Sequence, residues 1–150
     1  NGGYPTENAP DWSQIESVLA FRNAEYGDSA IFVCLANYEV TADSLSEYWE
    51  LPPPAAGQGW VELVLTRTLA DTNEPPLVPG RYDFDTPQGM AELTGAAKIL
   101  VENGTGIQFV TGGGDDYVEV TSVDDTLISG TFHVGDNWSE ISGSFSAPIK

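Results

Sequence analysis

Aromatic side chains beside turn-forming segments are the best candidates for binding in this sequence. Tyr48 and Trp49 stand just before a proline-rich stretch at 52–54, and Trp60 directly follows Gly57-Gln58-Gly59. Exposed aromatic rings flanked by acidic residues suit stacking against a sugar or against the peptide of a partner protein. The simpler interpretation is that these rings pack on the prolines and hold the loop against a sheet. Both interpretations stay open at this point.

Paired aspartates near glycine-rich turns are the best candidates for metal binding. Asp115 and Asp116 follow three consecutive glycines, and Asp124 and Asp125 follow the next predicted strand. Calcium prefers carboxylate and carbonyl oxygens of this kind on loops. A strand over 117–123 would hold the two pairs ~20 Å apart, so one ion cannot use both. The alternative is that these acids only keep the protein soluble. In that case a chelator leaves the melting temperature unchanged, which is the result we expect.

Nucleophilic hydrolysis and zinc chemistry are disfavoured, because the chain has one histidine and one cysteine. His133 alternates with Phe132 and Val134 in a predicted strand and is expected to point to solvent. Cys34 lies in the apolar run 30–36, where a cysteine typically behaves as a small buried hydrophobe. One histidine and one cysteine cannot supply the nitrogen and sulfur ligands of a zinc site, and a base-assisted triad is equally unsupported.

Glycoside hydrolysis needs only two carboxylates, so the acidic residues keep an enzymatic alternative open. The chain has 23 aspartates and glutamates, and the sequence does not single out a pair among them. A secreted carbohydrate-active enzyme of this kind would require a cleft in which two acids converge.

Composition excludes several classes of partner. The chain has 150 residues, five lysines and arginines, and a formal net charge of -18. Nucleic-acid binding needs a clustered positive face, which five basic residues cannot build. No apolar run approaches the ~20 residues of a membrane-spanning helix, so we expect no transmembrane segment. Hydrophobic residues make up 41% of the chain, which indicates a folded domain.

The elements that must position these residues are mostly strands. Apolar and polar residues alternate with period two in nine segments separated by Gly, Asn and Asp turns: 15–22, 30–40, 60–69, 80–85, 98–102, 107–111, 117–123, 126–134 and 138–147. Such spacing predicts an all-β, single-domain antiparallel sandwich or barrel of about eight to nine strands. A helix over 11–23 is a competing interpretation of the first segment.

One short helix is predicted between the second and third of these strands. Ser44 and Glu47 form a capping box, in which each side chain satisfies a free backbone donor at the helix start. Tyr48 and Trp49 then fall on its apolar face. The prolines at 52–54 end it, because proline lacks the N–H that a helix needs.

A short repeat near the end of the chain predicts a hairpin. Ile128-Ser129-Gly130-Thr131-Phe132 recurs as Ile141-Ser142-Gly143-Ser144-Phe145. A register centred on the loop between the copies places Gly130 opposite Gly143 and each phenylalanine opposite an isoleucine, all facing the core. The opposed glycines predict that a large side chain from elsewhere, a Trp or Tyr, covers them. His133 then faces solvent.

The second half of the chain and its leader resemble known proteins. The tail from Val120 through Pro148, together with Leu77-Val78-Pro79-Gly80-Arg81-Tyr82-Asp83-Phe84, resembles β domains of uncharacterised bacterial cell-envelope lipoproteins. The resemblance implies a lipidated cysteine upstream of residue 1 and supplies no catalytic residues. Residues 1–11 fit a flexible leader or tether ahead of a single domain over 12–150.

These observations together predict a non-catalytic, extracytoplasmic binding or scaffolding domain at the cell envelope. We expect it in the periplasm or on the cell surface, lipid-tethered upstream of residue 1, with an unknown protein or glycan as its partner. The two-carboxylate enzyme is the alternative.

Overall fold

The computed structural model describes residues 15–22, 30–40, 55, 57–69, 75–84, 92–102, 107–111, 115–135 and 140–150. The predicted leader over 1–11 and the predicted helix over 44–49 lie outside these residues, and Tyr48 and Trp49 therefore do as well.

The described part of the chain is all-β, as the periodicity predicts, and no helix occurs in it. Its strands are β1 (Ser17–Arg22), β2 (Ala30–Ala36), β3 (Gly59–Arg67), β4 (Gly80–Asp83), β5 (Leu93–Glu102), β6 (Ile107–Thr111), β7 (Tyr117–Val123), β8 (Leu127–Gly135) and β9 (Glu140–Pro148). The first predicted segment forms a strand, so the helical alternative is wrong over β1. Ala20 and Phe21, which are adjacent in the sequence, pack in two different apolar clusters on opposite faces of the sheet, as in a strand.

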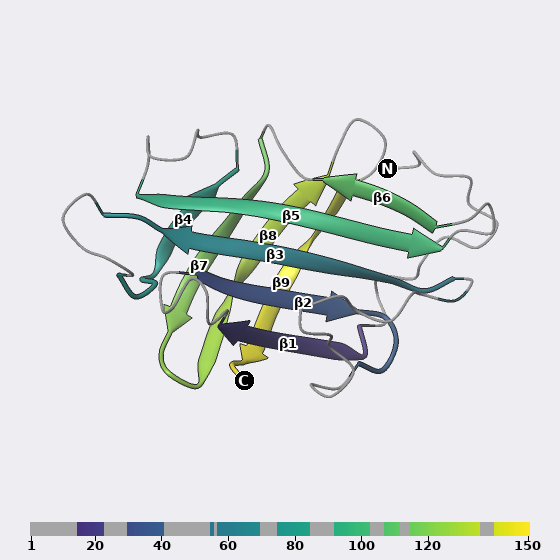
Figure 1. Cartoon of the computed structure of the whole chain (residues 1–150), viewed down its shortest axis with the longest axis horizontal. Coiled ribbons are helices and arrows are strands. Elements are labelled where there is room, and N and C mark those ends of the chain that lie inside the picture. Colours follow the sequence, from purple (N-terminus) through teal and green to yellow (C-terminus); the bar gives the residue numbers. More distant parts are fainter. Residues whose placement is uncertain are drawn as a thin grey trace.

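The strands form one nearly closed, barrel-like sheet in the order β1-β2-β3-β5-β4-β7-β8-β9, and β6 extends it by pairing with β5. In Figure 1, β1, β2, β3, β5 and β6 run side by side, while β7, β8 and β9 cross behind them at a steep angle. Most neighbours are antiparallel, as predicted. Exceptions are β4 with β5, paired in parallel at Asp83 and Thr94, and β1 with β9, which meet at a parallel bridge.

The inside of the barrel is filled by apolar side chains from eight strands. Val61, Leu63 and Leu65 of β3 share the inner face, as the alternation predicts, and are at most 1% exposed. Their neighbours in this cluster include Tyr82 of β4 and Phe132 of β8. The barrel interior is therefore a packed core of side chains.

A second apolar cluster lies on the outer face of β1, β2 and β3. It consists of Phe21, Cys34, Ala36, Tyr38, Val40 and Trp60. Cys34 is 3% exposed, which agrees with its placement in an apolar run. Burial, and then the charge of neighbouring Glu62, raise the pKa of the Cys34 thiol well above its usual value. This cysteine is held as an uncharged packing residue.

The predicted hairpin exists, but its predicted register is wrong by two residues. Phe132 pairs with Gly143, and Gly130 pairs with Phe145, so each aromatic side chain opposes a glycine. The predicted facing is correct, because Phe132 and Phe145 lie on the same side with ring centroids 6.3 Å apart. Two bulky rings fit on one face of the hairpin because each ring lies across from a glycine, which has no side chain.

The prediction that a Trp or Tyr covers these two glycines is also wrong, because other groups lie over them. The ring of Phe132 itself lies over Gly143, 3.6 Å from the point that a Cβ would occupy. At Gly130 the neighbour is backbone: a Cβ would clash with the carbonyl oxygen of Glu119 in β7. A register shift between Val120 and Ser122 brings the backbone of β7 into this position.

Candidate functional site

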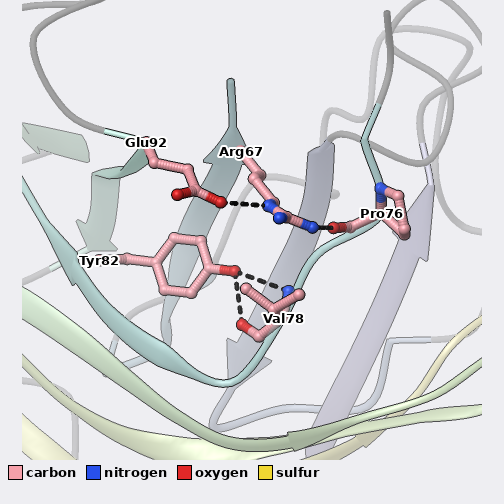
Figure 2. A network of polar contacts seen from close by, with 5 residues as sticks. All are labelled: Arg67, Pro76, Val78, Tyr82 and Glu92. Carbon is pink, nitrogen blue, oxygen red and sulfur yellow. Dashed lines mark hydrogen bonds and ion pairs between the residues drawn. The ribbon is translucent and has the colours of Figure 1, made fainter. Parts of the chain in front are cut away.

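The 77–84 motif builds a structural corner rather than a reactive centre. Tyr82 is fully buried, and its hydroxyl donates to the carbonyl oxygen of Val78 at 2.8 Å and accepts from the Val78 amide at 3.3 Å. Figure 2 shows the ring aimed at this loop backbone. A tyrosine that bonds the backbone a few residues upstream fixes the corner where the chain enters a strand. Burial raises the pKa of Tyr82 to about 12, so the phenol stays neutral.

Arg67, at the end of β3, supports the same corner from the other side. Its Nε donates to Glu92 at 2.7 Å, and its Nη1 donates to the carbonyl oxygen of Pro76 at 2.8 Å (Figure 2). These contacts join β3, the segment before β5 and the loop before β4. Both contacts hold strands in position.

Of the predicted stacking residues, only Trp60 falls in the described part of the chain. It begins the outer face of β3, is 7% exposed and packs in the outer cluster with Phe21 and Tyr38. Its indole N–H is buried and has no hydrogen-bond partner among the described residues. In this arrangement Trp60 presents no ring face to solvent, and the stacking role assigned to these aromatic residues remains a prediction.

The aspartates predicted to hold calcium have unlike surroundings. Asp115 is exposed, whereas Asp116 is 6% exposed and its carbonyl oxygen accepts from the amide of Phe84 at 3.3 Å. Asp124 accepts from the backbone of Thr126 and Leu127, and these hydrogen bonds lower its pKa. No group of three or more His, Cys, Asp or Glu side chains that could hold a metal occurs in the described segments.

His133 lies on the outer face of the β7–β8 pair, as predicted. Its ring stacks on Tyr117 with centroids 6.1 Å apart, and the guanidinium of Arg81 lies 3.9 Å from the centre of the Tyr117 ring. Arg81 also pairs with Asp83 at 2.7 Å. These side chains form a cross-strand ladder on a polar sheet face, where such pairs typically stabilise strand pairing.

The structure reveals a feature that the sequence did not indicate: an incompletely closed edge between β1 and β9, which we call the seam. The two strands run parallel and meet at one end, through the bridge between Ala20 and Ile149 and a 2.8 Å bond from the Lys150 amide to the Ala20 carbonyl. No other strand pairing between β1 and β9 is found among the described residues. In that part of the chain, the seam is therefore fastened at the C-terminal end of β9.

Part of the β9 backbone turns its hydrogen-bonding groups toward the seam, where the described residues offer them no strand partner. The amide of Ile149 bonds to Thr126 on the β8 side, whereas that of Lys150 points to β1. Because directions alternate along an antiparallel strand and the β8–β9 register has no shift, Ser142 and Ser144 also turn their N–H and C=O groups toward the seam. Residues 142–144 are all exposed, although Gly143 belongs to the inward-facing set.

An apolar pocket of about 120 Å³ opens beside this exposed part of β9. Its inner wall is formed by Leu35, Val61 and Phe132 from the barrel core, and its outer wall by Ile15, Ile141 and residues 142–144. Ile15 is 37% exposed, and Leu127 is the other exposed large apolar side chain in the described part of the chain. An engineered apolar cavity of roughly 150 Å³ is enough to bind benzene, so this pocket can hold one apolar side chain.

Comparison of the chain with protein-family models, with curated proteins and with solved structures finds no match. Within the described residues, no helix is long and apolar enough to cross a membrane. Among the described residues, the seam and its pocket are the arrangement from which we argue a function.

Proposed function

We propose that the chain is a non-catalytic binding or scaffolding domain of the bacterial cell envelope, tethered outside the cytoplasm through its N-terminus. Its partner is a protein or a glycan of that compartment. The observation that carries the binding role is the seam pocket, where an apolar cavity adjoins exposed strand backbone. Concave, mainly apolar sites with a few oriented polar groups are the usual form of a binding site.

The rest of the fold supports a role in binding. The barrel core is packed with side chains, and Tyr82 and Arg67 use their polar groups to fix strands. The lining of the pocket consists of apolar side chains, one glycine and two serines. Such a lining favours contact and shape complementarity over proton transfer.

The envelope location and the binding role can be tested together in the source bacterium. The gene product, with everything it encodes upstream of residue 1, is tagged and carries a photo-crosslinking amino acid at Ser142. We expect the protein in the envelope fraction and a discrete crosslinked adduct on irradiation. The same crosslinker at Thr131, which is exposed on the outer face of β8, serves as the control and should give no such adduct.

Recovery of the protein in the cytosol would contradict the envelope location. An identical adduct pattern from positions 142 and 131 would contradict a binding site at the seam.

A further inference from the structure

In the seam, a stretch of β9 that has no strand partner among the described residues adjoins an apolar pocket. The two are spaced as the backbone and an alternate side chain of one extended peptide would be. Ser142 and Ser144 are two residues apart, which is the repeat of a β-strand, and both direct backbone groups into the seam. The pocket lies at the intervening Gly143. A peptide pairing with this edge would alternate its side chains in the same way, so one of them would enter the pocket.

We infer that the seam accepts an extended segment of a partner protein by strand addition to β9, with one medium-sized apolar side chain in the pocket and basic residues on either side. The inference rests on the proposed binding role and names the partner of that site. In this mode main-chain hydrogen bonds supply affinity, and the pocket for an alternate side chain supplies specificity.

Charge determines which occupant the seam favours. The chain carries a net charge of -18. Glu16 is exposed beside Ile15 at the open end of the seam. Lys150 lies at the closed end, next to Ala20. A segment with Lys or Arg beside its apolar residue therefore complements the open end. A second copy of this chain would bring the same negative charge, which opposes self-association.

Proline at an equivalent position of β9 shows how the edge can be tested without breaking the sheet. Pro148 is two positions from Ser146 and four from Ser144, so it belongs to the seam-facing set of backbone positions. The sheet tolerates a missing N–H there because that group does not bond to β8. Ser144→Pro removes one seam-facing donor, whereas Ser144→Ala changes the side chain and keeps the donor.

The pocket can be filled independently of the strand edge. A Cβ at Gly143 would lie 3.6 Å from the Phe132 ring, which is an ordinary contact, so Gly143→Ala should fit. Gly143→Val adds two further methyl groups that extend into the pocket. The alanine variant is thus the matched control for the valine variant, and this pair keeps the inference testable if Ser144→Pro does not fold.

The experiment is an NMR titration of the isotope-labelled protein with the heptapeptide Lys-Thr-Thr-Leu-Thr-Thr-Lys. We expect chemical-shift changes centred on Ile15 and residues 142–144. Ser144→Pro should weaken binding about fivefold and Gly143→Val about tenfold, while both alanine variants stay within about twofold. Replacing the peptide's leucine by serine should weaken binding about tenfold, and replacing its lysines by glutamates should also weaken it.

Several results would overturn the inference. Shifts spread over the acidic surface, or equal binding of the serine-containing peptide, would show attraction by charge alone. If hexanoate changes the chemical shifts of the pocket residues and Ser144→Pro has no effect on peptide binding, the pocket belongs to a small apolar ligand. If sedimentation shows a dimer that forms through residues 142–144, the pocket belongs to a second copy of this chain. Each of these results leaves the proposed envelope location intact. If instead the protein binds the peptide but is found in the cytosol, only the envelope location is contradicted.

Discussion

Tyr82 is fully buried and yet uses its hydroxyl as both donor and acceptor. In sequence it is one aromatic residue of an alternating segment, and its inward facing follows from that alternation. Its bonds to Val78 could not be predicted, because they depend on how the loop turns back over β4. The same holds for Trp60, whose burial depends on packing across three strands. For single residues, alternation predicts which side of the sheet a side chain faces. Its hydrogen-bond partners can be identified only from the folded structure.

Removing the Tyr82 hydroxyl should destabilise the protein. Tyr82→Phe leaves the Val78 carbonyl and amide without this partner in a part-buried corner, so we expect a loss of about 1 to 2 kcal/mol in the free energy of unfolding. Urea denaturation measures it. Tyr117→Phe is the matched control and should cost little, since its hydroxyl has no partner among the described residues. Equal losses in both variants would contradict the role of the corner.

Alkaline pH should destabilise the protein through its buried tyrosines. Burial raises the pKa of both Tyr82 and Tyr38 to about 12, against about 10 in the unfolded chain. Their contribution to stability is therefore complete below pH 10 and is lost as the pH rises toward 12. Denaturation followed from pH 9 upward should show this decline, with a shallower slope for Tyr82→Phe. A flat profile over this range would show that the phenols ionise as readily in the folded state as in the unfolded one.

At the scale of strands, the sequence predicts most elements well. The predicted segments 107–111 and 117–123 coincide with β6 and β7, because turn residues bound them on both sides. The segment at 98–102 is too short, since β5 begins at Leu93 with Thr94, Gly95 and two alanines that carry little periodic signal. The hairpin register is wrong because loop-centred pairing ignores packing: placing each phenylalanine against a glycine relieves crowding inside the barrel.

The two glycines of the repeat should respond differently to the same substitution. Gly130→Ala would put a Cβ against the Glu119 carbonyl of β7, and backbone cannot move away cheaply, so we expect a loss of about 2 kcal/mol or more. Gly143→Ala faces only the Phe132 ring at ordinary contact distance and should stay within about 0.5 kcal/mol. Thermal or urea unfolding of both variants provides the comparison. A Gly143→Ala variant as unstable as Gly130→Ala would contradict the observed register.

For the whole molecule, composition and spacing predict the fold class but not the seam. The closing contact joins Ala20 to Ile149, nearly the full length of the domain apart, and no local pattern marks such a pair. The pocket combines Ile15, which precedes β1, with residues from four strands, which only the closed sheet brings together. Stacking by Tyr48 and Trp49 and calcium binding by Asp115 and Asp116 remain predictions from the sequence.

The net charge of -18 should make stability depend on salt. Repulsion among the acids destabilises the compact state, and screening shortens its range from ~30 Å at about 0.01 M salt to ~3 Å at about 1 M. We expect the melting temperature to rise by several degrees over this range in sodium chloride. A melting temperature independent of salt would show that the acids are spaced too widely to repel one another.

The central claim is that the seam is open along β9, and amide hydrogen exchange by NMR tests it most directly. Gly143 and Phe145 bond to β8, whereas Ser142 and Ser144 direct their amides into the seam. The structure therefore predicts an alternating pattern, with Ser142 and Ser144 exchanging orders of magnitude faster than Gly143 and Phe145 in the free protein. Equal, strong protection of all four amides would show that the edge is already paired and would contradict the account.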